Sequence, residues 1–339
     1  MSRLLSAAAL ALAAVLLTAC TSSDPASGPL QPVGETAPDA YAARPIPSGQ
    51  VDTAINGLDQ MVTDVLQRTG VPGMSVAVVR GGEIVYAKGF GVRELGKEAK
   101  VDANTVFQLA SVSKSVGSTC VSAAVTKKLV SWSDPVTTYL PDFALSDPEV
   151  TKRVTIADLY AHRSGLPYQA GDDLEAFGFD RAGVLAKLRQ FELDPFRISY
   201  HYSNFGLTAG AQAAAAAAKR PWEQLCSDLL YTPLGMTSTS STYADFTGRE
   251  NRATLHFRTG DKAFEARYTR DADAQSPAGG VSSSANDMAR WLMMNLADGK
   301  VGTQTVIDPD ALRESHTAQI ATGPLQSSDA RSRFYGYGF

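Results

Sequence analysis

The sequence contains few residues of the kinds that bind metals or nucleic acids. Among its 339 residues there are three cysteines and four histidines, and the formal net charge is −4. The histidines lack zinc-site spacing such as His-x-x-x-His; they are His162, His201, His256 and His316. Charged residues are spread along the chain, and no basic run is of the kind that binds nucleic acid. We therefore expect neither a metal site nor a nucleic-acid partner.

Two motifs of other enzyme classes are also absent. The stretch Gly91-x-x-x-x-Gly96-Lys97 resembles a phosphate-binding loop, but Glu98 stands where Ser or Thr would bind magnesium. A turn between strands explains this stretch better. No Gly-x-Ser-x-Gly motif occurs, which argues against a Ser-His-Asp triad on an α/β-hydrolase fold.

Residues 1–20 have the pattern of an export signal. Arg3 supplies a positive charge, Leu4–Leu17 is uncharged and rich in Leu and Ala, and small residues lead to Cys20. The ending Leu-Thr-Ala-Cys resembles the bacterial lipobox, in which cleavage precedes a cysteine that carries lipid. We therefore predict an exported protein anchored through Cys20 to the outer face of the bacterial cell membrane. A plain signal peptide and an uncleaved anchor are the alternatives.

Residues 21–50 follow with six prolines and many Ser, Gly and Ala residues. Such a segment buries little surface and remains extended, so it is interpreted as a flexible tether. The folded domain is predicted over residues 51–339, where the composition is that of an ordinary globular protein. Cys120 and Cys226 both fall in predicted helices. Because the sequence does not place them within bonding distance, we expect two buried free thiols rather than a disulfide.

The folded part begins with a helix and a hairpin. Apolar residues from Val51 to Leu66 have helical spacing, and Gly70 follows as a stop signal. The apolar runs Ser75–Val79 and Ile84–Ala87 are joined by Arg-Gly-Gly-Glu, which favours a β-hairpin. A helix followed by a hairpin suggests a helix packed on an antiparallel sheet.

The pattern after Asp102 is mostly helical. Ser111–Lys128 has almost no charge after Lys114, which indicates a helix buried on nearly all sides. A Gly/Ser-rich loop is expected over Pro277–Ser284. Shorter helices are expected near 155–162, 181–191, 204–219, 221–230 and 286–296. We therefore predict an α/β (α+β) fold, with an antiparallel sheet flanked by helices and a mostly helical region inserted between its first and returning strands.

Ser111 and Lys114 form a Ser-x-x-Lys pair. Residues three apart share a helix face, and helical side chains tilt toward the N-terminus, so Lys114 leans toward Ser111 and away from Ser118. Burial and the positive end of the helix dipole should lower the lysine pKa, which would let it take the serine proton. The amide of Ser111 would supply half of an oxyanion hole. The alternative for the isolated pair is a capped helix without catalytic function.

A second candidate motif is Tyr202-Ser203-Asn204. In an extended segment, residues two apart point the same way, so Tyr202 and Asn204 could enter one pocket while Ser203 turns away. Tyrosine can relay protons, and asparagine can hold a substrate amide or the lysine amine. The alternative is that Asn204 caps the following helix while Tyr202 packs in the core.

Together these motifs resemble the penicillin-recognising serine hydrolases: class C β-lactamases, D-alanyl-D-alanine carboxypeptidases and related esterases. The similarity runs from about residue 53 to the end and includes seven segments in the family's order: VPGMSVAVVRGGEIVYAKGFG, FQLASVSKS, SDPVTTYLP, LYAHRSGLP, YSN, PLGM and SPAGGVSSSANDMARWL. The resemblance implies a β-lactamase/transpeptidase-like fold, Ser111 as acylated nucleophile, Lys114 and Tyr202 as the proton-transfer pair, and Asn204 as a substrate contact. His162, where the family also has a histidine, is expected to brace a turn.

The family's third motif, Lys/His-Thr/Ser/Gly-Gly on a strand, is missing. His316-Thr317-Ala318 lacks the glycine and follows a helix-like stretch, and the final FYGYGF resembles the start of a returning strand. We therefore expect the domain to be incomplete at residue 339. The predicted function is acyl-enzyme hydrolysis of a lactam, a D-Ala-D-Ala peptide or an ester, without metal or cofactor, on a small-molecule or peptidoglycan-like substrate. The alternative is a non-catalytic penicillin-binding or cell-wall-associated module.

Overall fold

The computed structural model describes residues 47–323 and 333–339. The predicted signal segment, Cys20 and most of the predicted tether lie outside the described residues. The chain divides into two units, residues 1–53 and 54–339, and the candidate site lies in the second. Among the described residues, no helix has both the length and the apolar character needed to cross a membrane.

Helices dominate the described residues, and the strands are short. The helices are α2 (Gln50–Asn56), α3 (Leu58–Thr69), α4 (Val112–Thr126), α5 (Pro148–Arg153), α6 (Ile156–Tyr160), α7 (Asp172–Ala176), α8 (Arg181–Lys187), α9 (Asn204–Ala218), α10 (Trp222–Cys226), α11 (Tyr243–Gly248), α12 (Ser276–Gly279), α13 (Ala285–Leu296) and α14 (Pro309–His316). The strands are β1 (Gly73–Arg80), β2 (Glu83–Gly91), β3 (Phe107–Gln108), β4 (Phe257–Gly260), β5 (Ala263–Glu265), β6 (Ser282–Ser283), β7 (Lys300–Val301), β8 (Gln304–Thr305), β9 (Ile320–Ala321) and β10 (Phe334–Tyr335). In the described parts these strands form five separate two-stranded antiparallel sheets.

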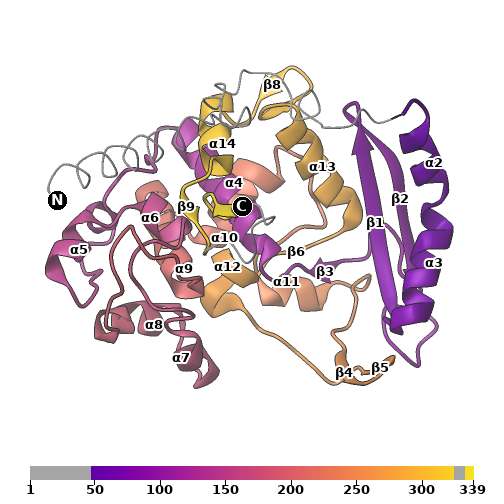
Figure 1. Ribbon diagram of the computed structural model, residues 1–339, viewed down its shortest axis with the longest axis horizontal. Coiled ribbons are helices and arrows are strands. Elements are labelled where there is room, and N and C mark those ends of the chain that lie inside the picture. Colours follow the sequence, from indigo (N-terminus) through magenta and orange to yellow (C-terminus); the bar gives the residue numbers. More distant parts are fainter. Residues whose placement is uncertain (1–46, 324–332) are drawn as a thin grey trace, which may run out of the picture. The chain divides into compact units, whose positions relative to one another are not determined.

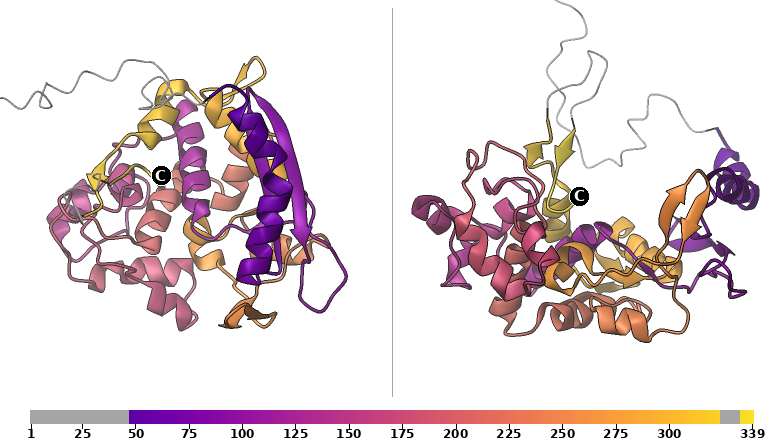
Figure 2. Two further views of the ribbon diagram at one scale, coloured as in Figure 1. Left: turned by 45° about the vertical axis from the view of Figure 1, so that its right-hand side comes forward. Right: turned by 90° about the horizontal axis from the view of Figure 1, so that it is seen from below.

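The hairpin of β1 and β2 confirms the prediction from its turn residues. Gly81 and Gly82 both have positive φ, as a tight Gly-Gly turn requires. Helix α3 lies along the hairpin on one side and α13 packs on the other (Figures 1 and 2). The helix expected from Val51 is two helices, because the chain breaks at Gly57; α3 then ends at the predicted stop, Gly70.

Helix α4 is the centre of the core, as its apolar sequence predicts. Most of its residues are buried, and it packs against α9, α10, α12 and α14 (Figure 1). Close packing is possible because α9 is rich in Ala and Gly; the backbone at Gly210 lies against the ring of Tyr160. The same close packing also places the start of α4 beside the start of α9.

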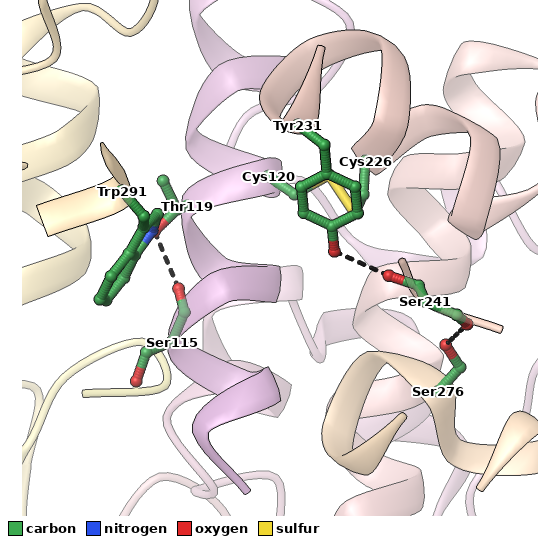
Figure 3. Close-up of a disulfide and its surroundings, with 8 residues drawn as sticks. All are labelled: Ser115, Thr119, Cys120, Cys226, Tyr231, Ser241, Ser276 and Trp291. Carbon is green, nitrogen blue, oxygen red and sulfur yellow. Dashed lines mark hydrogen bonds between the residues drawn. A yellow bond between two sulfur atoms is a disulfide. The ribbon is translucent and has the colours of Figure 1, made fainter. Parts of the chain in front are cut away.

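The expectation of two free thiols is wrong. Cys120 of α4 and Cys226 of α10 form a disulfide, with their Cα atoms 5.4 Å apart (Figure 3). The two helices lie side by side in the core, which brings together residues separated by 106 positions. The sequence pattern predicted each helix and gave no information on their mutual packing, so the pairing was missed.

Two further segments differ from expectation or refine it. The predicted loop at 277–284 contains the end of α12 and the strand β6, which pairs with β3. Strand β3 ends three residues before Ser111. The final FYGYGF includes the short strand β10, paired with β9. Gly338 then lies against α4, where an added Cβ would be 2.7 Å from the Lys114 carbonyl oxygen. The end of the chain therefore covers the helix that carries the candidate site.

Candidate active site

Ser111 stands at the N-terminus of α4, directly after a sharp turn of the backbone. The preceding Ala110 has φ +47°, a left-handed conformation that a residue with a Cβ rarely adopts. Such a strained residue is often found where a fold must present a reactive side chain. The turn leaves Ser111 exposed. No described acceptor takes a hydrogen bond from its amide, whereas the next amide, that of Val112, donates to the Leu109 carbonyl.

Lys114 is buried beside Ser111 and surrounded by oxygen atoms. Its Nζ lies 3.3 Å from Ser111 Oγ and donates to Asn204 Oδ1 at 2.7 Å and to the Ala278 carbonyl at 2.9 Å. Burial lowers the pKa of Lys114 to about 7, and the nearby Asp172 carboxylate acts in the opposite direction. At neutral pH a large share of the lysine is therefore uncharged and has a lone pair that can accept a proton.

The other serines near Lys114 do not share this position. Ser113 Oγ accepts a hydrogen bond from the Val281 amide, and Ser115 Oγ donates to the Gly338 carbonyl. Ser118 is buried one turn further along α4. The described structure thus gives Ser111 alone both exposure and contact with the lysine, as the helical geometry of the motif predicts.

Tyr202 also contacts Ser111, and it lies beside the lysine. Its Oη donates to Ser111 Oγ at 2.7 Å, and the Lys114 Nζ lies 4.4 Å from the centre of its ring. Burial raises the pKa of Tyr202, so the phenol keeps its proton at neutral pH. The serine oxygen is therefore held between an amine that can accept a proton and a phenol that can donate one.

Tyr202, Ser203 and Asn204 lie as their alternation predicts. Tyr202 and Asn204 both reach the Ser111 site, while the buried Ser203 turns away and caps α9 by accepting from the Gly206 amide. The helix cap is therefore Ser203, not Asn204. The structure brings together Ser111, Lys114, Tyr202 and Asn204; their catalytic roles stay predictions.

His162 supports this segment from behind. Its Nδ1 accepts from the Ser203 amide at 3.2 Å, and its ring lies 4.6 Å from that of Tyr202. Complete burial, together with the nearby charge of Lys114, lowers the pKa of His162 to about 3. A neutral, buried imidazole in this position supports the backbone of the Tyr202 segment, whereas the sequence led us to expect it at the turn before Ser164-Gly165.

A cavity beside Ser111 brings in several residues that no catalytic motif marks. A cavity of about 260 Å³ is lined by Ser111, Asn204, Gln108, Tyr268 and Arg270, among others. Arg270 is paired with Glu175 at 2.7 Å. Asp172 receives a hydrogen bond from Asn204. No catalytic motif in the sequence marks Tyr268, Arg270, Asp172 or Glu175, because the last two lie on α7 and the first two on a distant loop, and only the fold brings them together.

The substitute considered for the third motif is not on a strand. His316 is the last residue of α14 and packs against the ring of Phe339, with the ring centres 4.2 Å apart. Burial lowers its pKa. Within residues 47–323 and 333–339, no group of three or more His, Cys, Asp or Glu side chains could hold a metal ion.

The fold and the arrangement of Ser111, Lys114 and Tyr202 are those expected of the family that the sequence motifs resemble. Comparison with known proteins identifies the same family. The family model Beta-lactamase matches residues 58–339, so the chain belongs to the beta-lactamase family. An unguisins hydrolase of Aspergillus campestris is 27% identical over 68% of this chain and 45% of its own length. A beta-lactamase of Lysobacter lactamgenus is 28% identical over 72% of this chain and 60% of that protein.

The solved structures agree on the fold. The octameric penicillin-binding protein homologue from Pyrococcus abyssi superposes with a TM-score of 0.68 at 18% identity, over 84% of this chain and 64% of that one. At this identity the likeness shows the fold alone, which is the β-lactamase/transpeptidase-like fold expected from the sequence. The chain spans about half the length of the first curated relatives it matches.

Proposed function

We propose that this protein is a serine hydrolase that forms an acyl-enzyme on Ser111. The observation that carries the proposal is the position of Ser111 Oγ, 3.3 Å from Lys114 Nζ and 2.7 Å from Tyr202 Oη. An exposed serine between a buried amine and a neutral phenol is suited to nucleophilic attack with general acid–base assistance.

The proposed reaction has two stages. The neutral Lys114 amine takes the Ser111 hydroxyl proton as Oγ attacks the substrate carbonyl carbon, and the Ser111 amide faces the oxyanion that forms. As the carbonyl re-forms, the bond to the leaving nitrogen or oxygen breaks. The leaving group takes the Tyr202 phenol proton, which the Lys114 ammonium replaces. Water then attacks the acyl ester by the same proton path, releasing the acid and free Ser111.

The proposed substrates are a lactam, a D-Ala-D-Ala peptide or an ester. Hydrolases and beta-lactamases among the relatives support hydrolysis of an amide or ester bond, and a shared fold does not choose between these substrates. We further propose that the protein is exported and anchored through Cys20. The Cys120–Cys226 disulfide supports this location, since disulfides persist mainly in oxidising compartments.

The second candidate is a binding module that is acylated once and does not turn over. His316, the only substitute for the third motif considered in the sequence, ends a helix and packs on Phe339. A site without that motif would lack one group that holds the substrate and the oxyanion. Loss of one oxyanion donor typically costs about 3–4 kcal/mol in the transition state.

Three substrates test the proposal: a chromogenic cephalosporin, a D-Ala-D-Ala peptide and a short-chain ester. We expect the wild type to hydrolyse at least one of them and Ser111→Ala to hydrolyse none. Ser118→Ala is the matched control, because it removes a serine hydroxyl about two turns further along the same helix. Peptide mass spectrometry should find a fluorophosphonate label on Ser111. Label on Ser113 or Ser118 contradicts the assignment, and one acylation without turnover favours the binding module.

A further inference from the structure

Asn204 links Lys114 to the carboxylate of Asp172, a residue that no sequence motif marks. The Asn204 Oδ1 accepts from Lys114 Nζ at 2.7 Å, and its Nδ2 donates to Asp172 Oδ2 at 2.9 Å. A carboxylate only accepts hydrogen bonds, so it fixes which end of the amide faces the lysine. Were the amide reversed, its NH₂ group would point at Lys114 and leave the amine without this acceptor.

The position of Asp172 is itself fixed by packing. It begins α7, and the preceding Gly171 is buried with φ +96°. An added Cβ at Gly171 would lie 2.7 Å from Val184 Cγ1 and 3.1 Å from the Phe205 ring, so only glycine fits there. The backbone that carries the carboxylate is thus seated on α8 and α9.

The charge of Asp172 acts on Lys114 and also on Arg270. The other charged or titratable groups near the two residues are Glu175, Arg270, Tyr202 and His162. Glu175 and Arg270 pair with each other at 2.7 Å, which leaves Asp172 outside that ion pair. Its Oδ1 is buried and has no hydrogen-bond partner in the described structure.

We propose that Asp172 is a positioning residue for acylation of Ser111, acting through Asn204 to hold the Lys114 amine and through its charge to stabilise the ammonium formed after proton transfer. This inference rests on the proposed function. During the reaction Lys114 gains a proton inside a buried site, where an isolated ammonium is unfavourable. A nearby carboxylate lowers that cost without touching the substrate.

Two substitutions separate geometry from charge. Asp172→Asn keeps an oxygen that can accept from Asn204 and removes the charge, so the pKa of Lys114 should fall below about 7. The shift should be about one pH unit, the scale of a neighbouring charge. Asp172→Ala also releases the Asn204 amide, and we expect acylation to slow by about 10- to 100-fold through misplacement of the lysine.

The pKa of Lys114 is measured in two ways on the full chain. The ¹³Cε resonance of Lys114 is titrated by NMR in lysine-labelled protein, with the peak assigned by Lys114→Arg. The acid limb of kcat/KM is measured with the best of the three substrates. Asp173→Asn is the matched control, because it removes the neighbouring exposed carboxylate of the same helix. Thermal unfolding verifies that each variant folds.

We expect Asp172→Asn to move both the resonance and the acid limb to lower pH and Asp173→Asn to move neither. An unchanged Lys114 titration in Asp172→Asn would overturn the inference, as would an equal shift in Asp173→Asn. If Asp172→Ala does not fold, Asp172→Asn alone decides. The NMR titration needs no turnover, so a chain that is never acylated contradicts the proposed function and leaves the coupling between Asp172 and Lys114 separately measurable.

Discussion

The disulfide between Cys120 and Cys226 should supply a large part of the stability of the fold. The perturbation is the double substitution Cys120→Ala with Cys226→Ala, which removes the cross-link from two fully buried positions. The bond joins residues 106 positions apart. In the chain-entropy model, releasing a loop of this length stabilises the unfolded chain by about 4.7 kcal/mol at 25 °C. Domains of this kind are stable by only about 5–15 kcal/mol in total.

Urea unfolding followed by tryptophan fluorescence measures this effect. We expect the double variant to lose about 4–5 kcal/mol relative to the oxidised wild type, with an additional small loss from the missing sulfur atoms. Reductant supplies the matched control. It should destabilise the wild type toward the level of the double variant and leave the double variant unchanged. A wild-type urea midpoint that reductant does not change, together with only a small loss in the double variant, would show that the cysteines are free thiols, as the sequence alone suggested.

Three further outcomes are expected. Lys114→Ala and Tyr202→Phe should each slow acylation of Ser111 at least ~100-fold, the scale of a positioned acid or base; full activity in Tyr202→Phe would remove the phenol from the proton path. Because we propose neutral Lys114 as the base, kcat/KM should fall about tenfold per pH unit below the lysine pKa of about 7; a rate that stays constant well into acid would exclude Lys114 as the base. Cys20→Ser should release the protein from membranes in a fractionation assay, and unchanged retention would indicate an uncleaved anchor.

Local patterns in the sequence were sufficient for several elements. The Gly81-Gly82 pair predicted the hairpin, because a tight two-residue hairpin turn requires positive φ, which glycine adopts readily. The spacing of Ser111 and Lys114 predicted their contact, because three residues on a helix define a face. The alternation of Tyr202 and Asn204 predicted a shared pocket, because residues two apart in an extended segment point the same way.

Features that depend on contacts between distant segments could not be predicted in this way. The disulfide requires α4 to pack against α10, and Asp172 reaches Asn204 only because Gly171 seats α7 on its neighbours. The serine-rich sequence of β6 resembles that of a loop. It forms a strand because β3 lies beside it and pairs with it. In each case the local sequence fits another structure equally well, and long-range packing decides the outcome.

The contact between α4 and the end of the chain has a consequence for the order of folding. Ser115 Oγ donates to the Gly338 carbonyl across 223 residues, and the Gly338 backbone lies against the Lys114 carbonyl. A ribosome working at about 5–20 residues per second needs roughly 10–45 s to make that intervening stretch. During this time the helix that carries Ser111 has been synthesised and still lacks the segment that covers it. A helix that has been made before its covering segment favours association with chaperones or other chains. The Ser111 helix is therefore completed by its neighbours only after the segment around Gly338, 223 residues further along the chain, has been made.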